Sequence, residues 1–324
     1  MALLDDILRV FGTNRVRLRW RVKETRDRWH RFWNRPARKA YEHKLCPQCG
    51  HPASREEKLC ASCGAALPSV AVDRATRFVA WLVPEGLPLG TMLFLTASAA
   101  LYFVTVKVSY DVFPDAGRRF APNGWVLLRY GASVPLLERD AGEWWRLVTA
   151  IFLHGDVIHL GFNALGLWVA GRTVEERFGR ARLIVTFLLT GVAGNLVSLA
   201  WRIHKGEEVV SSVGASGAVF GLIGCVVGHA LRRRGTSGRE LRARFVPWLL
   251  YGIIAGFAMS NIDNAAHLGG LACGLVVGSL LAERDRARGR LGEGIWIGLA
   301  LTVLAAAGLS FWLVATHPLP LPPG

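Results

Sequence analysis

Long apolar runs without charged residues recur through most of this 324-residue chain, and they constrain its fold more than any other feature. A helix that crosses a bilayer needs roughly 20 mostly apolar residues. Runs of this kind begin at Leu89, Leu183, Val209, Phe245, Asn264 and Gly294. A further stretch, from Leu147 to Gly171, is interrupted by His154-Gly155-Asp156, and we expect its second part, from Val157, to be helical. The sequence therefore predicts an all-α polytopic membrane protein with seven spans.

The net charge of +15 would suit a nucleic-acid-binding protein, but the basic residues are concentrated in alternate loops between the predicted spans. The N-terminal segment and every second loop after it hold 31 of the 39 Lys and Arg residues, and the remaining loops hold 8. Because positively charged loops stay in the cytoplasm, we expect a cytoplasmic N-terminus and an outside C-terminus. No groove-reading motif is present, which argues against nucleic acid as a partner.

The residues before the first span form three segments. Residues 1–44 are rich in Arg and Trp, and two interpretations stay open: a basic amphipathic helix on the inner leaflet of the lipid bilayer, or a solvated, disordered tail. Residues 45–66 are expected to form a small metal-binding module, and residues 67–88, with three prolines, a linker. We expect no signal peptide, because the first residues are charged and lack an early apolar core. The residue usage favours the inner membrane of a bacterium.

Two Cys-x-x-Cys-Gly turns make up the metal-binding module. The thiols belong to Cys46, Cys49, Cys60 and Cys63. Four thiolates suit tetrahedral Zn²⁺ and leave no open position, so we expect a structural or partner-binding ion rather than a catalytic one. Disulfides are the alternative, and a reducing cytosol disfavours them. The module resembles the zinc-ribbon that accompanies many prokaryotic proteins.

Polar side chains inside the spans point to chemistry, because ionisable groups in hydrocarbon are costly. Ser216 lies in a Gly-rich segment of the fourth span, and His267 lies near the start of the sixth. His159 and Asn163, four residues apart, share one face of the second span. The predicted topology puts these residues at one depth, open to outside water. A nucleophile and a base held there suggest hydrolysis within the membrane.

Each of these residues also has a structural explanation. Ser216 among glycines could serve helix packing, His267 could be a satisfied core histidine or part of an ion path, and Asn163 could bond between helices. Gly270 and Gly274 form a G-x-x-x-G pattern that is typical of helix packing. Such packing would bring the sixth span against the fourth, within reach of a Ser–His hydrogen bond.

In these features the chain resembles the rhomboid family of intramembrane serine proteases, over about residues 89–282. The motifs that carry the resemblance are Trp145-Arg146, His159-x-x-x-Asn163, Glu175-x-Arg177, Gly214-x-Ser216-Gly217 and Ala266-His267-x-x-Gly270-x-x-x-Gly274. The resemblance implies a six-helix core, to which residues 283–324 add a seventh transmembrane helix and a Pro-rich tail. The zinc-ribbon lies outside it.

The resemblance also implies roles for individual residues. Ser216 would be the nucleophile and His267 its general base, a dyad without a required acid, while the Ser216 N–H, His159 and Asn163 would hold the oxyanion. His154 would line the cavity, and Phe220 would stack on His267.

The resemblance gives Asp263, four residues before His267, no part in a triad. No cofactor is implied for catalysis. The substrates would be transmembrane proteins, cut near the outer face.

Three other functions compete with an active protease. A rhomboid-like protein that only binds membrane clients would have no reason to keep both the dyad and the oxyanion residues. A transporter would need paired carboxylates or an inverted repeat, which the spans lack. The zinc-ribbon and the basic segment could recruit a cytosolic partner, and we expect deletion of residues 1–88 to leave cleavage intact.

Overall fold

The computed structural model describes residues 23, 43–46, 51–54, 56–67, 87–114, 120–233, 235–259, 262–281 and 290–322. The chain divides into two compact units, Met1–Leu87 and Pro88–Gly324. Cys49 and most of residues 1–44 and 67–88 lie outside the described residues. Both interpretations of the N-terminal segment therefore stay open.

The described part of the first unit is a small β structure. Strand β1 (His43–Leu45) pairs antiparallel with β2 (Pro52–Ser54), and a second turn is closed by a bridge between Leu59 and Ala66. Cys46 and Cys60 are buried in its core. So small a core buries little apolar surface, which is why the sequence led us to expect a metal here.

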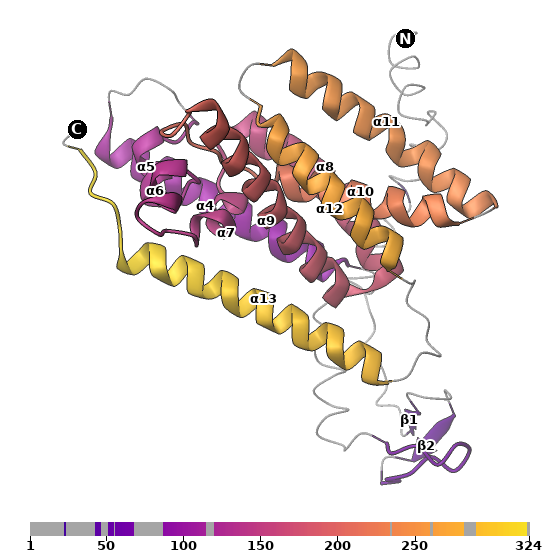
Figure 1. Cartoon of the computed structure of the whole chain (residues 1–324). Helices are drawn as coiled ribbons and strands as arrows, with labels where there is room; N and C mark the ends of the chain where they lie inside the picture. The colour runs from indigo at the N-terminus through magenta and orange to yellow at the C-terminus, as the bar shows by residue number, and fades with distance from the viewer. Residues whose placement is uncertain are drawn as a thin grey trace. The chain divides into compact units, whose positions relative to one another are not determined.

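The second unit is built from helices, and the seven longest correspond to the seven predicted spans (Figure 1). Its elements are α4 (Leu89–Val112), α5 (Gly124–Arg129), α6 (Pro135–Arg139), α7 (Arg146–Thr149), the 3₁₀-helix η1 (Ala150–Phe152), α8 (Val157–Phe178), α9 (Arg180–Lys205), α10 (Ser216–Arg232), α11 (Thr236–Ala258), α12 (Asn264–Leu280) and α13 (Arg290–Thr316). The predicted all-α polytopic fold is confirmed.

Contacts between helix ends are consistent with helices that cross the bundle in alternating directions. At one end the first turn of α8 meets the segment before α10, where His159 lies against Gly214. At the opposite end Glu175 of α8 accepts the Gly90 N–H of α4 at 2.9 Å. Arg182 of α9 pairs there with Glu293 of α13 at 2.7 Å. The starts of α8 and α10 therefore share one end of the bundle, as the predicted topology requires.

The helices differ in how far they reach through a bilayer. Four described helices, α4, α9, α11 and α13, are long and apolar enough to cross. A fifth span results if α7–η1 and α8, which meet at 94°, count as one. Helices α10 and α12 have 17 residues each, which is about 25 Å of helix against about 30 Å of hydrocarbon. Two of the seven predicted spans therefore cover only part of the depth.

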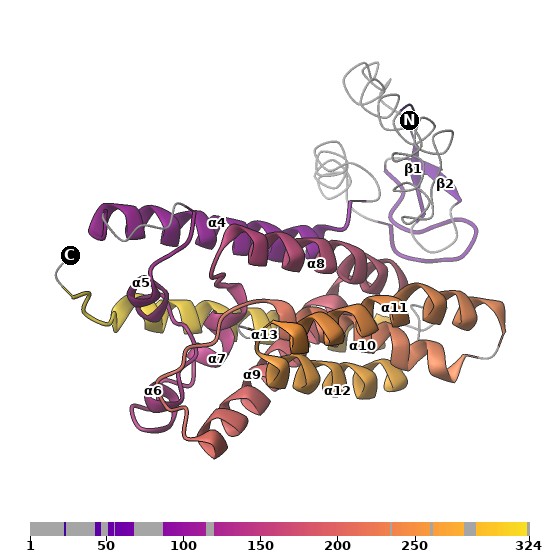
Figure 2. The same ribbon diagram turned by 90° about the horizontal axis from the view of Figure 1, so that it is seen from above.

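Helix α10 is the centre of the bundle. It contacts α8, α9, α11 and α12 (Figure 2), and every residue from Gly217 to Ala230 is buried. Glycines allow its closest contact, because a Cβ on Gly270 would overlap the Gly217 carbonyl and a Cβ on Gly274 would overlap the Gly221 carbonyl. The predicted packing of the sixth span against the fourth is confirmed.

The start of α10 corrects the sequence prediction. The apolar run begins at Val209, but the helix begins at Ser216. Two backbone hydrogen bonds between Ser133 and Ser212, of 3.1 and 2.8 Å, tie the preceding segment to the loop after α5. Gly214 then has a φ of +129°, which side-chain-bearing residues rarely adopt. The run is broken there, and Ser216 becomes the first residue of a helix.

Candidate active site

Ser216 occupies the N-terminal end of α10 and is half-buried. The Gly214 N–H donates to the Ala150 carbonyl at 2.9 Å, which fixes the turn before the helix. The N–H groups of a first helical turn have no partners within the helix and carry a partial positive charge. A negative charge that forms beside Ser216 therefore meets favourable donors.

His267 lies in the first turn of α12, next to the start of α10. Its ring stacks on Phe220 with centroids 4.2 Å apart and planes 12° apart. The contact expected between these two rings is thus confirmed. A Cβ on Gly217 would lie 3.2 Å from the Ala266 carbonyl oxygen. The backbones of α10 and α12 therefore touch at the residue after Ser216 and the residue before His267. The Nδ1 atom of His267 is buried and has no hydrogen-bond partner in the described part of the chain.

Asp263 does not fill that position, although it precedes His267 by one turn. Its Oδ1 caps α12 by accepting the Ala266 N–H at 3.0 Å. Its Oδ2 accepts from Ser212 at 2.7 Å, from Arg202 at 3.1 Å and from Ser198. The carboxylate therefore joins α9 and the segment before α10 to α12.

The same contacts determine the charge state of Asp263, which lies in the loop before α12. Burial by itself would raise its pKa. Hydrogen bonds from Ser198, Ser212 and the Ala266 N–H, with the charge of Arg202, outweigh burial and hold the pKa below its ordinary value of 3.8. Asp263 is therefore a charged structural link at neutral pH.

His159 and Asn163 lie on the face of α8 that meets the segment before Ser216. A Cβ on Gly214 would fall 2.7 Å from His159 Nε2 and 3.8 Å from Asn163 Nδ2. The Gly155 N–H points at His159 Nδ1 at 3.5 Å, so Nδ1 accepts and Nε2 carries the proton in the neutral ring. Asn163 Nδ2 donates to the His159 carbonyl at 3.0 Å and keeps a second proton. Two side-chain donors thus face the loop that leads to Ser216.

His154 packs against the ring of His159. It is fully buried, and its ring meets that of His159 with centroids 5.1 Å apart and planes at 64°. Its Nδ1 lies 3.2 Å from the Phe152 carbonyl. The structure therefore gathers all four predicted catalytic residues at one end of the bundle, while their catalytic roles stay predictions. The sequence did not predict the hydrogen bonds that the Asp263 carboxylate accepts, because their donors are 51 to 65 residues away in sequence.

The predicted zinc ligands lie in the first unit. The sulfur atoms of Cys46, Cys60 and Cys63 all lie within 4.8 Å of one another, and Cys46 and Cys63 are 3.6 Å apart. Sulfurs about 2.3 Å from a tetrahedral zinc would be about 3.8 Å apart. This cluster of three cysteines could hold a metal ion, and Cys49 lies outside the described residues.

Comparison with known proteins identifies the family of this chain. The model of the rhomboid domain matches residues 141–284, a range that includes Ser216, His267, His159 and Asn163. RHOMBOID-like protein 5 of Arabidopsis thaliana is 32% identical over 64% of this chain and 70% of its own length. The chain belongs to the rhomboid family. YdcA of Bacillus subtilis is 33% identical to this rhomboid over 51% of the chain and 85% of YdcA.

Coverage differs among the relatives. The rhomboid protease GluP of B. subtilis is 32% identical over 71% of this rhomboid, which spans 41% of the length of GluP. The rhomboid domain and the relatives named as proteases support a hydrolase of the intramembrane serine protease class.

Proposed function

We propose that this rhomboid hydrolyses peptide bonds of transmembrane proteins with Ser216 as nucleophile and His267 as general base. His267 would take the Ser216 hydroxyl proton as the oxygen attacks the carbonyl carbon, and would return the proton to the leaving amine. Water would then cleave the acyl-enzyme, with His267 again taking its proton. Each cycle consumes one water and regenerates both residues.

The oxyanion of each tetrahedral intermediate would accept from the Ser216 N–H, His159 Nε2 and Asn163 Nδ2. Preorganised donors of this kind act on charge that exists only near the transition state. Removing one such donor typically lowers kcat about 10²- to 10³-fold. We expect His159→Ala and Asn163→Ala each to fall in that range.

One observation carries the proposal: the His267 ring stacks on Phe220, one helical turn beyond Ser216. Stacking fixes the plane of the imidazole, so that no carboxylate is needed to orient it. The partnerless Nδ1 in the described structure agrees with a dyad.

The test is cleavage of a single-span reporter in liposomes by the wild type, Ser216→Ala and His267→Ala. Ser211→Ala and His204→Ala are matched controls, because both residues are exposed and lie outside the dyad. We expect cleavage by the wild type and the controls only. Cleavage by Ser216→Ala would refute the nucleophile. No cleavage by any correctly inserted variant would favour the client-binding function.

The same proposal includes the membrane setting. The chain would lie in the inner membrane of a bacterium, with its N-terminus in the cytoplasm, as the loop charges favour. The site would then open to the outer side. Substrate helices must unwind to expose a peptide bond, so small or helix-breaking residues near the outer face would favour cleavage.

A second function concerns the first unit, where we propose that Cys46, Cys49, Cys60 and Cys63 bind structural Zn²⁺. The close sulfurs of the three described cysteines support it. Zinc would fold this unit, and the folded unit would present a surface to a cytosolic partner. Elemental analysis of purified protein should find about one zinc per chain. Cys46→Ser should lose it and Cys225→Ser, in α10, should keep it. Equal zinc in both variants would refute the site.

A further inference from the structure

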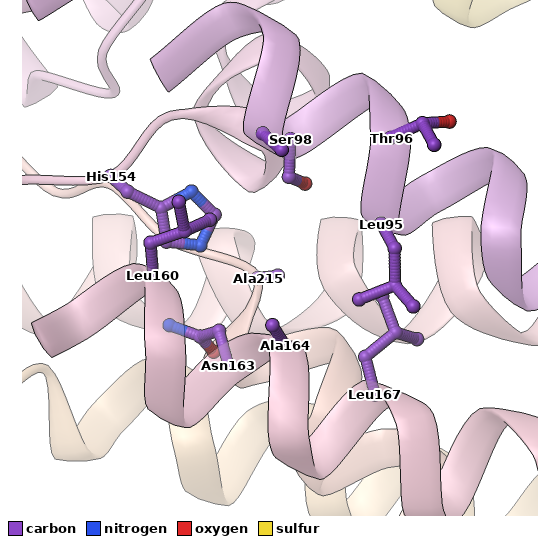
Figure 3. Close-up of a pocket in the computed structure, with 10 residues that line it drawn as sticks. Leu95, Thr96, Ser98, His154, Leu160, Asn163, Ala164, Leu167 and Ala215 are labelled. Carbon is purple, nitrogen blue, oxygen red and sulfur yellow. The ribbon is translucent and has the colours of Figure 1, made fainter. Parts of the chain in front are cut away.

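A cavity of about 280 Å³ lies between α4 and α8, directly behind the oxyanion residues. Ser98 of α4, Asn163 of α8, His154 and Ala215 are among the residues that line it. Figure 3 shows the His154 ring on one side of the cavity, Leu95 and Leu167 on the other, and Ser98 between the two sides. Thr96 also lines the cavity, and its hydroxyl donates to the Met92 carbonyl of its own helix at 2.8 Å.

Two polar atoms of residues that line the cavity lack partners within the described residues. They are the Ser98 hydroxyl oxygen and His154 Nε2. Both residues are deeply buried, with Ser98 4% exposed and His154 0% exposed. Buried polar groups in proteins almost always have a hydrogen-bond partner, if necessary an ordered water.

The protonation pattern of His154 makes the two groups complementary. Its Nδ1 lies 3.2 Å from the Phe152 carbonyl, which can only accept, so Nδ1 carries the proton. In the neutral ring Nε2 is then an acceptor that needs a donor. The Ser98 hydroxyl is a donor, and a water takes about 30 Å³ of liquid volume, so the cavity has room for a bridge.

We propose that Ser98 is a positioning residue: its hydroxyl bonds, through water in this cavity, to His154 Nε2 and so holds the His159 ring in place. His154 would act on His159 through the edge-to-face contact of their rings, whose centroids are 5.1 Å apart. The effect on catalysis rests on the proposed function, since His159 matters there as an oxyanion donor. The hydrogen bond itself does not depend on it.

Four variants test the proposal. Ser98→Ala removes the hydroxyl, Ser98→Cys keeps the size but offers only a weak donor, and Ser98→Thr keeps the hydroxyl. Thr105→Val is the matched control, because Thr105 is also buried on α4 but its hydroxyl bonds the Tyr102 carbonyl of its own helix.

The activity readout is kcat per active site, counted by fluorophosphonate labelling of the nucleophile, together with KM. We expect Ser98→Ala and Ser98→Cys to lower kcat about tenfold with KM unchanged, less than the loss of a direct oxyanion donor. Inhibition by a peptide aldehyde, whose adduct needs the oxyanion hole, should weaken by a similar factor. Ser98→Thr should restore both quantities. A purely structural role would change the fraction of labelled protein and not these ratios.

A second readout needs no activity. In ¹⁵N-histidine-labelled protein in bilayers, the Nε2 resonance of His154, assigned with His154→Gln, should shift in Ser98→Ala and not in Thr105→Val. An unchanged resonance, or kcat per site within twofold of wild type in Ser98→Ala, would overturn the proposal. If the resonance shifts but the wild type neither cleaves nor is labelled, the proposed function fails and the Ser98 contact stands.

Discussion

Gly194 of α9 offers a sharp test of how the two halves of the dyad are held, because it touches both backbones that carry them. A Cβ at this position would lie 2.6 Å from the Ala266 carbonyl oxygen and 3.4 Å from the Gly217 Cα. Ala266 immediately precedes His267, and Gly217 immediately follows Ser216. The substitution Gly194→Ala therefore acts on the dyad without changing any group that takes part in it.

The size of the effect follows from these distances. Ordinary Cβ contacts begin at about 3.4 Å, so the start of α12 must move by about 0.8 Å to accommodate the methyl group. A backbone carbonyl cannot rotate away as a side chain can. Overpacking of this kind costs about 1–3 kcal/mol of stability, and a displacement near 1 Å can lower the rate about 10²-fold. We expect kcat to fall about 10- to 100-fold with KM nearly unchanged.

The assay is reporter cleavage in liposomes, with the thermal unfolding midpoint of the same preparations measured alongside. Gly308→Ala in α13 is the control, because a Cβ there meets nothing within 4 Å, and we expect wild-type activity. A wild-type kcat for Gly194→Ala would refute the claim that α9 sets the spacing of the dyad. So would an equal loss in the control.

Three further predictions concern Phe220, Asp263 and residues 1–88. Phe220→Tyr should keep wild-type kcat, while Phe220→Ala should lower it about tenfold through loss of the stack on His267; equal kcat in both variants would contradict this role. Asp263 has a lowered pKa, so its carboxylate stabilises the fold above about pH 3.8 and less as the pH falls below that value; Asp263→Asn should lower Tm at pH 7, and the difference from wild type should shrink below pH 4. Deleting residues 1–88 should leave reporter cleavage intact, and its loss in a correctly inserted truncation would make the first unit part of the enzyme.

Features governed by local pattern could be predicted from the sequence. Apolar runs and breakers gave the positions of the long helices, and the spacing of Gly270 and Gly274 predicted the close approach of α12 to α10. These features depend on helical periodicity, which a sequence displays directly.

Features made by distant partners could not be predicted in the same way. The apolar run extends without a charged residue from Val209 to Leu231, and pairing of Ser212 with Ser133, 79 residues away, helps to remove its first residues from the helix. The cavity next to Ser98 depends in the same way on how α4 and α8 meet. Hydropathy carries no information on such pairings, and an apolar run alone cannot distinguish helix from extended loop.

The contact between α10 and α12 has a consequence for how the protein responds to heat. The glycines there bring backbone against backbone, so at these positions no side-chain rotamer is frozen when the contact forms and none is released on warming. Looser contacts between long side chains gain conformational freedom gradually with temperature. We therefore expect the logarithm of kcat to fall on a straight line against inverse temperature up to the onset of unfolding, where activity should be lost abruptly.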